Sequence, residues 1–220
     1  MRLTILLFDG FTALDVVGGY EVLANVPGME VEFAAVTEGV VATDTGRLGM
    51  LAYRRLDQVV STDILYVPGG AGVSAALEDK TLLDSIRRLD ALSQWTVSIC
   101  NGAELLGAAG LLAGKRVTTN WFARDKVAAY GALVEHTRFK RDGKLVTGAG
   151  VSASIDAGLF LAGLLAGEAT ARLIQFGIEY FPAPPFGSSS PDEQPETAKA
   201  TLRRIEQASP QRLAARDIPF

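Results

Sequence analysis

The sequence predicts an α/β fold in which helices surround a largely parallel β-sheet. Short apolar and β-branched runs alternate with helical patterns along most of the chain, which is typical of such folds. The chain has 220 residues, of which 48% are hydrophobic and 21% charged, enough to bury a sizeable core in one domain. Its single cysteine, Cys100, directly follows one of the apolar runs.

The predicted elements follow one another at short intervals. Strands are expected at Leu3 to Leu7, Val31 to Val36, Ile64 to Val67, Thr96 to Ile99, Thr118, Val134 to Phe139 and Lys144 to Thr147, and a hairpin at Val40 to Tyr53. Helices are expected at Leu14 to Ala24, Leu77 to Leu92 and Ala103 to Ala109, and two more follow Thr147. Residues 1–195 are assigned to the domain and 196–220 to a helical arm, with its helix at Glu196 to Ala215.

Cys100 is predicted to lie at a nucleophile elbow, a sharp turn between a strand and a helix. Gly102 is expected to permit that turn. A thiol near a helix N-terminus is favoured as thiolate, so we expect a lowered pKa for Cys100. The alternative is an inert, buried cysteine that packs as a small apolar residue.

Two further strand ends carry unusual residues. Asp15 follows the first strand, and a glycine-rich turn that includes Gly70 follows the strand at Ile64 to Val67. Because ligands bind at the carboxyl ends of strands in open sheets, we expect these ends to meet near Cys100. The backbone N–H groups of Gly70 and Asn101 are candidate donors to a developing negative charge. A first-turn helix acid and a plain tight turn are the alternatives for Asp15 and Gly70.

Several classes of function are disfavoured. The only histidine, His136, lies in a predicted strand far from the elbow in sequence, so neither a Cys-His-Asp triad nor a zinc site is expected. No nucleotide-binding motif is present, and no cofactor is implied. The net charge of −4 predicts no nucleic-acid partner, and no segment is predicted to span a membrane. Cytoplasmic localisation is the expectation.

A series of motifs extends over most of the chain: Phe8 to Leu23, Val67 to Gly70, Ser98 to Gly102, Gly107 to Gly114, Thr118 to Trp121, Gly177 to Tyr180, and Pro182 to Phe186 with Ser190 and Pro191. In this order the motifs resemble the ThiJ/PfpI (DJ-1-like) superfamily, including its isocyanide hydratase branch. The resemblance implies a flavodoxin-like three-layer sandwich related to the class I glutamine amidotransferases. It also implies a homodimer that acts on a small-molecule substrate.

The resemblance implies chemistry as well. In that branch a cysteine attacks the isocyanide carbon, a thioimidate forms, and water releases an N-formamide. Cys100 matches the nucleophile and Asp15 the assisting acid. Asn101 and Asn120 stand where the family commonly has Thr and His, and Asn120 and Trp121 are candidates for the substrate pocket.

Other activities remain open on these residues. The same thiol and acid could serve a glyoxalase or deglycase-like reaction on reactive aldehydes, or Cys100 could be a redox sensor without turnover. Because only the backbone of Asn101 is assigned a role, replacing it by threonine is expected to preserve activity.

Overall fold

The computed structural model describes residues 1–187 and 189–208 and confirms the α/β fold with a mostly parallel sheet. The strand order is β10-β11-β7-β6-β1-β2-β5, and only β10 runs antiparallel to its neighbour. The strands are β1 (Arg2–Leu6), β2 (Glu30–Ala35), β5 (Arg54–Arg55), β6 (Ile64–Val67), β7 (Trp95–Ile99), β10 (Phe139–Asp142) and β11 (Leu145–Gly148). All four residues of β6 are buried, as expected for a central strand covered on both faces.

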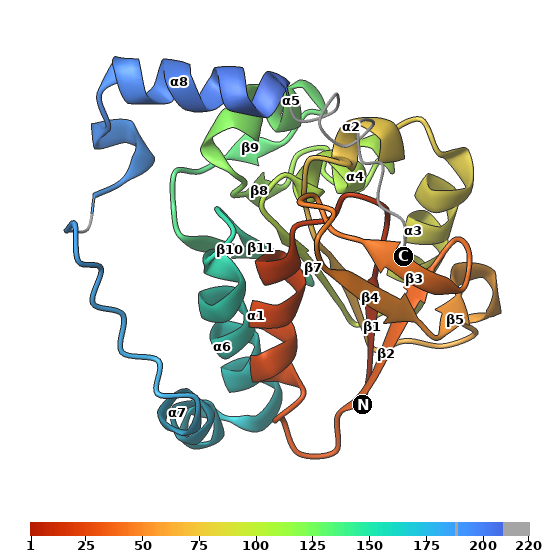
Figure 1. Ribbon diagram of the computed structural model, residues 1–220. Helices are drawn as coiled ribbons and strands as arrows, with labels where there is room; N and C mark the ends of the chain where they lie inside the picture. The colour runs from red at the N-terminus through yellow and green to blue at the C-terminus, as the bar shows by residue number, and fades with distance from the viewer. Residues whose placement is uncertain (188, 209–220) are drawn as a thin grey trace.

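Helices cover both faces of this sheet, giving the three layers visible in Figure 1. Helices α1 (Ala13–Leu23) and α6 (Ala153–Ala166) pack together on one face, and α3 (Lys80–Leu92) and α4 (Gly102–Ala108) pack together on the other. The remaining described helices are α2 (Val73–Ala76), α5 (Arg124–Ala129), α7 (Glu168–Gly177) and α8 (Glu196–Gln207). None of the helices in the described part of the chain is long and apolar enough to cross a bilayer.

Two small sheets account for most departures from the predicted elements. The expected hairpin is formed by β3 (Gly39–Ala42) and β4 (Gly49–Ala52). The predicted strand from Val134 to Phe139 is divided, because β9 (Leu133–Val134) pairs with β8 (Arg116–Val117), whereas Phe139 begins β10. Helix α5 was not predicted. The predicted arm helix is described as far as Gln207, and residues 209–220 lie outside the described part of the chain.

Helix α1 is held close to the sheet and to α6 by two buried hydroxyl groups. Tyr66 donates to the carbonyl of Asp15 at 2.5 Å, and Ser154 donates to the carbonyl of Leu14 at 3.0 Å. Both hydroxyl groups lie against glycines of α1. A Cβ atom on Gly19 would lie 2.2 Å from the Tyr66 hydroxyl, and a Cβ atom on Gly18 would lie 2.2 Å from the Ser154 hydroxyl. The two glycines therefore allow the contacts that position the first turn of α1.

We expect Gly19→Ala to lower the free energy of unfolding by about 1–3 kcal/mol, because the new methyl group overlaps the buried ring of Tyr66. Urea denaturation measures the change. Gly163→Ala in α6 is the matched control, since its methyl group meets only Ala171 at 3.7 Å and alanine favours helix. Equal stability of the two variants would contradict this account of α1.

Candidate active site

Three loops meet at the carboxyl ends of β1, β6 and β7. The N–H of Thr12 donates to the carbonyl of Gly69 at 2.9 Å, and the N–H of Gly72 donates to the carbonyl of Gly10 at 3.0 Å. A Cβ atom on Gly70 would lie 2.4 Å from the carbonyl oxygen of Gly10, so only glycine permits this approach. The predicted meeting of the strand ends is therefore present in the structure.

Cys100 lies at the turn between β7 and α4, with a positive φ of 57°. A left-handed conformation costs a non-glycine residue about 1–2 kcal/mol and is concentrated at functional sites. The strained residue is thus the cysteine itself, and not Gly102 as the sequence predicted. Gly102 begins α4 against the carbonyl of Pro68, where a Cβ atom would come within 2.6 Å.

Burial raises the pKa of the Cys100 thiol well above its ordinary value, and the nearby carboxyl of Asp15 adds to that shift. The side chain is 4% exposed. Two donors oppose the shift: Nδ2 of Asn120, at 3.1 Å from Sγ, and the backbone N–H of Asn101. The predicted lowering of this pKa is therefore wrong, because loss of water outweighs these donors.

Asp15 is fully buried in the first turn of α1. Its Oδ2 accepts a hydrogen bond from the N–H of Gly69 at 2.7 Å, and no described atom is a hydrogen-bond partner of Oδ1. Burial raises the pKa of Asp15 to about 8, the Gly69 bond opposes the rise, and Asp44 adds to it. The carboxyl group beside Cys100 is therefore predominantly protonated at pH 7 and can donate a proton.

The side chain of Asn101 links the elbow to the neighbouring loop by two hydrogen bonds. Its Oδ1 accepts from the N–H of Gly70 at 2.8 Å, and its Nδ2 donates to the carbonyl of Gly70 at 3.1 Å. The Gly70 N–H, a predicted oxyanion donor, is thus occupied by an amide oxygen. The N–H of Asn101, the second predicted donor, faces the cysteine sulfur.

A cavity of about 410 Å³ opens beside Cys100. Asn120 lines it as predicted, whereas Phe122 takes the place expected for Trp121. The lining residues are Thr12, Asp44, Thr45, Gly70, Ala71, Cys100, Asn101, Asn120, Phe122, Val151 and Glu206. Sequence reasoning missed Asp44 and Glu206. Asp44 lies in the predicted hairpin turn, but nothing in the charged segment after Pro195 singled out Glu206.

His136 takes no part in this cavity. Its Nδ1 lies 3.0 Å from Oδ2 of Asp192 and 3.2 Å from the guanidinium of Arg124. The side chain is exposed, and the absence of a catalytic role for His136 stays a prediction.

We expect alkylation of Cys100 by iodoacetamide to show a midpoint above the value of about 8.5 for free cysteine, since the thiolate is poorly solvated. Asn120→Ala should raise the midpoint further, because it removes the donor to sulfur. The rate measured against pH, with free cysteine as control, gives both midpoints. A wild-type midpoint below 8 would contradict the burial argument.

Contrary to the expectation from sequence, Asn101→Thr should lower the rate of any reaction at Cys100. Threonine is too short to reproduce both hydrogen bonds to Gly70, and an unmade buried hydrogen bond costs about 1–3 kcal/mol. We expect a loss of about tenfold or more in kcat/KM, with Ser98→Ala as the control for a nearby buried hydroxyl. Full activity of Asn101→Thr would show that the reaction needs only the backbone N–H of residue 101 and not the side chain of Asn101.

The chain is similar to known proteins in both sequence and structure. Isonitrile hydratase of Pseudomonas putida is 41% identical over 204 residues, covering 93% of this chain and 89% of that protein. The crystal structure of a ThiJ/PfpI family protein from Pseudomonas syringae has a TM-score of 0.89 and 30% identity, covering 97% of this chain and 89% of that one.

More distant proteins share the fold. Drosophila melanogaster DJ-1beta has a TM-score of 0.74 at 22% identity, covering 82% of this chain and 98% of that one. Residues 1–162 match the DJ-1/PfpI family. The identity and coverage of these matches, with the same fold and a cysteine at the elbow, show that the chain belongs to the DJ-1/PfpI family.

Proposed function

We propose that this protein is an isocyanide hydratase that uses Cys100 as its nucleophile and Asp15 as its acid. The observation that carries the proposal is the buried carboxyl of Asp15, with a pKa of about 8, next to the only cysteine of the chain. Similarity to isonitrile hydratase over 93% of the chain supports the same assignment. Hydration of an isocyanide needs a proton at carbon, which a neutral carboxyl group can supply.

The first step joins sulfur to the isocyanide carbon. The thiol proton of Cys100 passes to Asp15 while the proton of the Asp15 carboxyl group passes to the carbon, so Asp15 ends the step neutral. The product is a thioimidate, in which the former isocyanide carbon carries sulfur, hydrogen and a double bond to nitrogen. This exchange does not require a stable thiolate, which fits a thiol whose pKa is raised.

The second step consumes one water molecule. Water adds to the thioimidate carbon and a proton goes to nitrogen, with Asp15 as the group that relays it. The C–S bond then breaks, sulfur regains its proton, and the N-formamide leaves. Nδ2 of Asn120 and the N–H of Asn101 are placed to stabilise negative charge on the departing sulfur.

Assembly as a homodimer is also proposed. Helix α7 and the segment after it expose large apolar side chains, since Leu173 is 69%, Phe176 67% and Phe181 65% exposed. Large apolar side chains exposed close together in sequence are typical of an interface between subunits.

Hydration of an aryl or alkyl isocyanide should require Cys100 and Asp15 but not His136. We expect Cys100→Ala to abolish turnover and Asp15→Asn to reduce it by about 10²- to 10⁴-fold, because each removes a group that transfers a proton or forms a bond. His136→Ala is the matched control and should retain activity. Loss of activity in a folded His136→Ala protein, with activity kept in Asp15→Asn, would refute the mechanism.

The pH profile gives an independent measurement. Because the neutral form of Asp15 donates the proton, kcat/KM should fall as pH rises through about 8. Residual activity of Asp15→Asn should lack this descending limb.

A wild type that turns over no isocyanide, but acts on reactive aldehydes or only undergoes oxidation, would favour the aldehyde-directed or the sensor function instead.

A further inference from the structure

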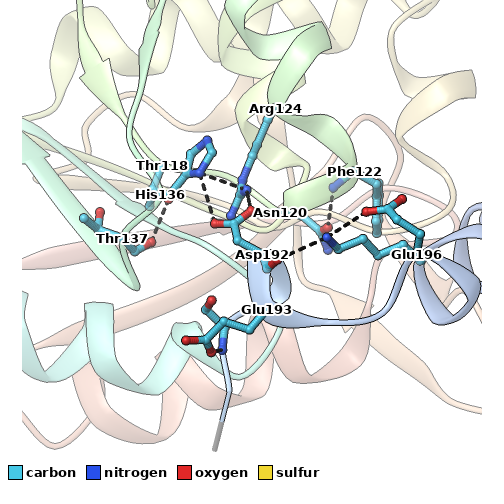
Figure 2. Close-up of polar contacts among 11 residues, drawn as sticks. Thr118, Asn120, Phe122, Arg124, His136, Thr137, Asp192, Glu193 and Glu196 are labelled. Carbon is cyan, nitrogen blue, oxygen red and sulfur yellow. Dashed lines mark hydrogen bonds and ion pairs between the residues drawn. The ribbon is translucent and has the colours of Figure 1, made fainter.

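The chain after α7 runs along one side of the molecule to α8 (Figure 1), and on the way Asp192 contacts the domain. Figure 2 shows Asp192 between two side chains of the domain: Arg124 donates to its Oδ1 at 2.5 Å, and Nδ1 of His136 lies 3.0 Å from its Oδ2. The Arg124 contact lowers the pKa of Asp192. The short helical turn that carries Asp192 is closed by a capping box between Ser190 and Glu193. The start of α8 is thus fixed in place.

Helix α8 is directed from this anchor along one side of the catalytic loops. Lys199, Arg203 and Glu206 follow one another at spacings of four and three residues, which places them on one face of the helix. The Lys199 side chain is 15% exposed, and the Arg203 guanidinium lies 5.1 Å from the ring centre of Trp121. Helix α8 therefore packs against Trp121 through Arg203. Glu206, one turn further along α8, lines the cavity at Cys100.

The cavity is one-sided in charge. Two carboxyl groups line it, Asp44 from the turn between β3 and β4 and Glu206 from α8, and none of its described lining residues is lysine, arginine or histidine. Asp44 is oriented by the hydroxyl of Thr12, which donates to its Oδ2 at 2.5 Å. Burial raises the pKa of Glu206; Lys126 opposes the shift and Asp44 adds to it, as expected for two carboxyl groups at one cavity.

We propose that Glu206, delivered by α8, is a specificity-determining residue that favours uncharged or cationic electrophiles over anionic ones at Cys100. The proposal deepens the function proposed above, since it assigns a substrate class to that site: isocyanides without a carboxylate or phosphate. A negative charge that enters the cavity meets carboxylates, and there is no cation among the described lining residues. At distances of several ångströms this repulsion changes a rate constant by about three- to tenfold.

Alkylation of the single cysteine tests the proposal without any assumption about the natural reaction. Iodoacetamide is neutral, whereas iodoacetate carries a negative charge. Cys100 is the only thiol in the chain, so the rate of thiol alkylation reports on this site. The measured quantity is the rate constant for iodoacetamide divided by the rate constant for iodoacetate. At pH 8 and low salt, this ratio should be larger for the wild type than for free cysteine. Glu206→Gln should reduce the wild-type ratio by about three- to tenfold, and Glu206→Lys should reduce it more. Added salt should weaken the preference.

Glu168→Gln is the matched control, because it removes the same charge from α7, at the opposite end of the molecule from α8 (Figure 1). It should leave the ratio unchanged. Tryptophan fluorescence reports whether α8 still covers Trp121 in each variant. If Glu206→Gln keeps both this signal and the wild-type ratio, the assignment of Glu206 is overturned.

The hydration assay separates the two proposals. In Glu206→Gln, the kcat/KM for isocyanoacetate divided by the kcat/KM for a neutral alkyl isocyanide should rise by about three- to tenfold over the wild-type value, and this ratio cancels any general change in the reactivity of Cys100. Absence of all turnover would refute the hydratase function, and the alkylation ratio would then be the test of charge selection by Glu206. Turnover of both substrates with no change in Glu206→Gln would refute the role of Glu206 and leave the hydratase function in place.

Discussion

Removal of water from Asp15 and Cys100 is the constraint on which the rest of the site depends. Both side chains would ionise more readily in solvent, and both are held in a place where ionisation is unfavourable. The carboxyl group is consequently an acid at neutral pH, and the sulfur keeps its proton until a partner can take it. In the proposed mechanism the two groups exchange protons with a substrate and do not form an ion pair beforehand.

Such a pair needs a rigid surrounding, because a buried carboxyl group could otherwise turn towards water. The hydroxyls of Tyr66 and Ser154 fix the start of α1, and the N–H of Gly69 fixes one oxygen of Asp15. On the opposite side, Asn101 ties the elbow to Gly70 with both ends of its amide. Groups from β6, from α6 and from the loops around Gly69 and Asn101 thus hold the first turn of α1 and the elbow in place.

Much of this arrangement could be predicted from the sequence, for identifiable reasons. Parallel strands covered on both faces are apolar along their whole length, as at Ile64–Val67. Because Cys100 follows such an apolar run, it could be placed at the carboxyl end of a strand. The protonation of Cys100 could not be predicted in this way, because it depends on how much water the folded loops exclude. Helix α5 was missed, and the division of the strand predicted from Val134 to Phe139 into β9 and β10 was not foreseen, because elements of two to six residues carry too little periodicity. Glu206 was missed because its role depends on where a helix docks, which local sequence does not encode.

The anchored arm has a consequence for how this protein and its relatives can diverge. The family match ends at residue 162, whereas Asp192 and Glu206 lie beyond it. The groups proposed to make and break bonds and the group proposed to select substrates by charge therefore occupy separate stretches of the chain. Substitutions in the arm can accumulate without disturbing the costly geometry of the elbow. A lineage could acquire a new substrate range by exchanging α8 while its reaction chemistry stays the same.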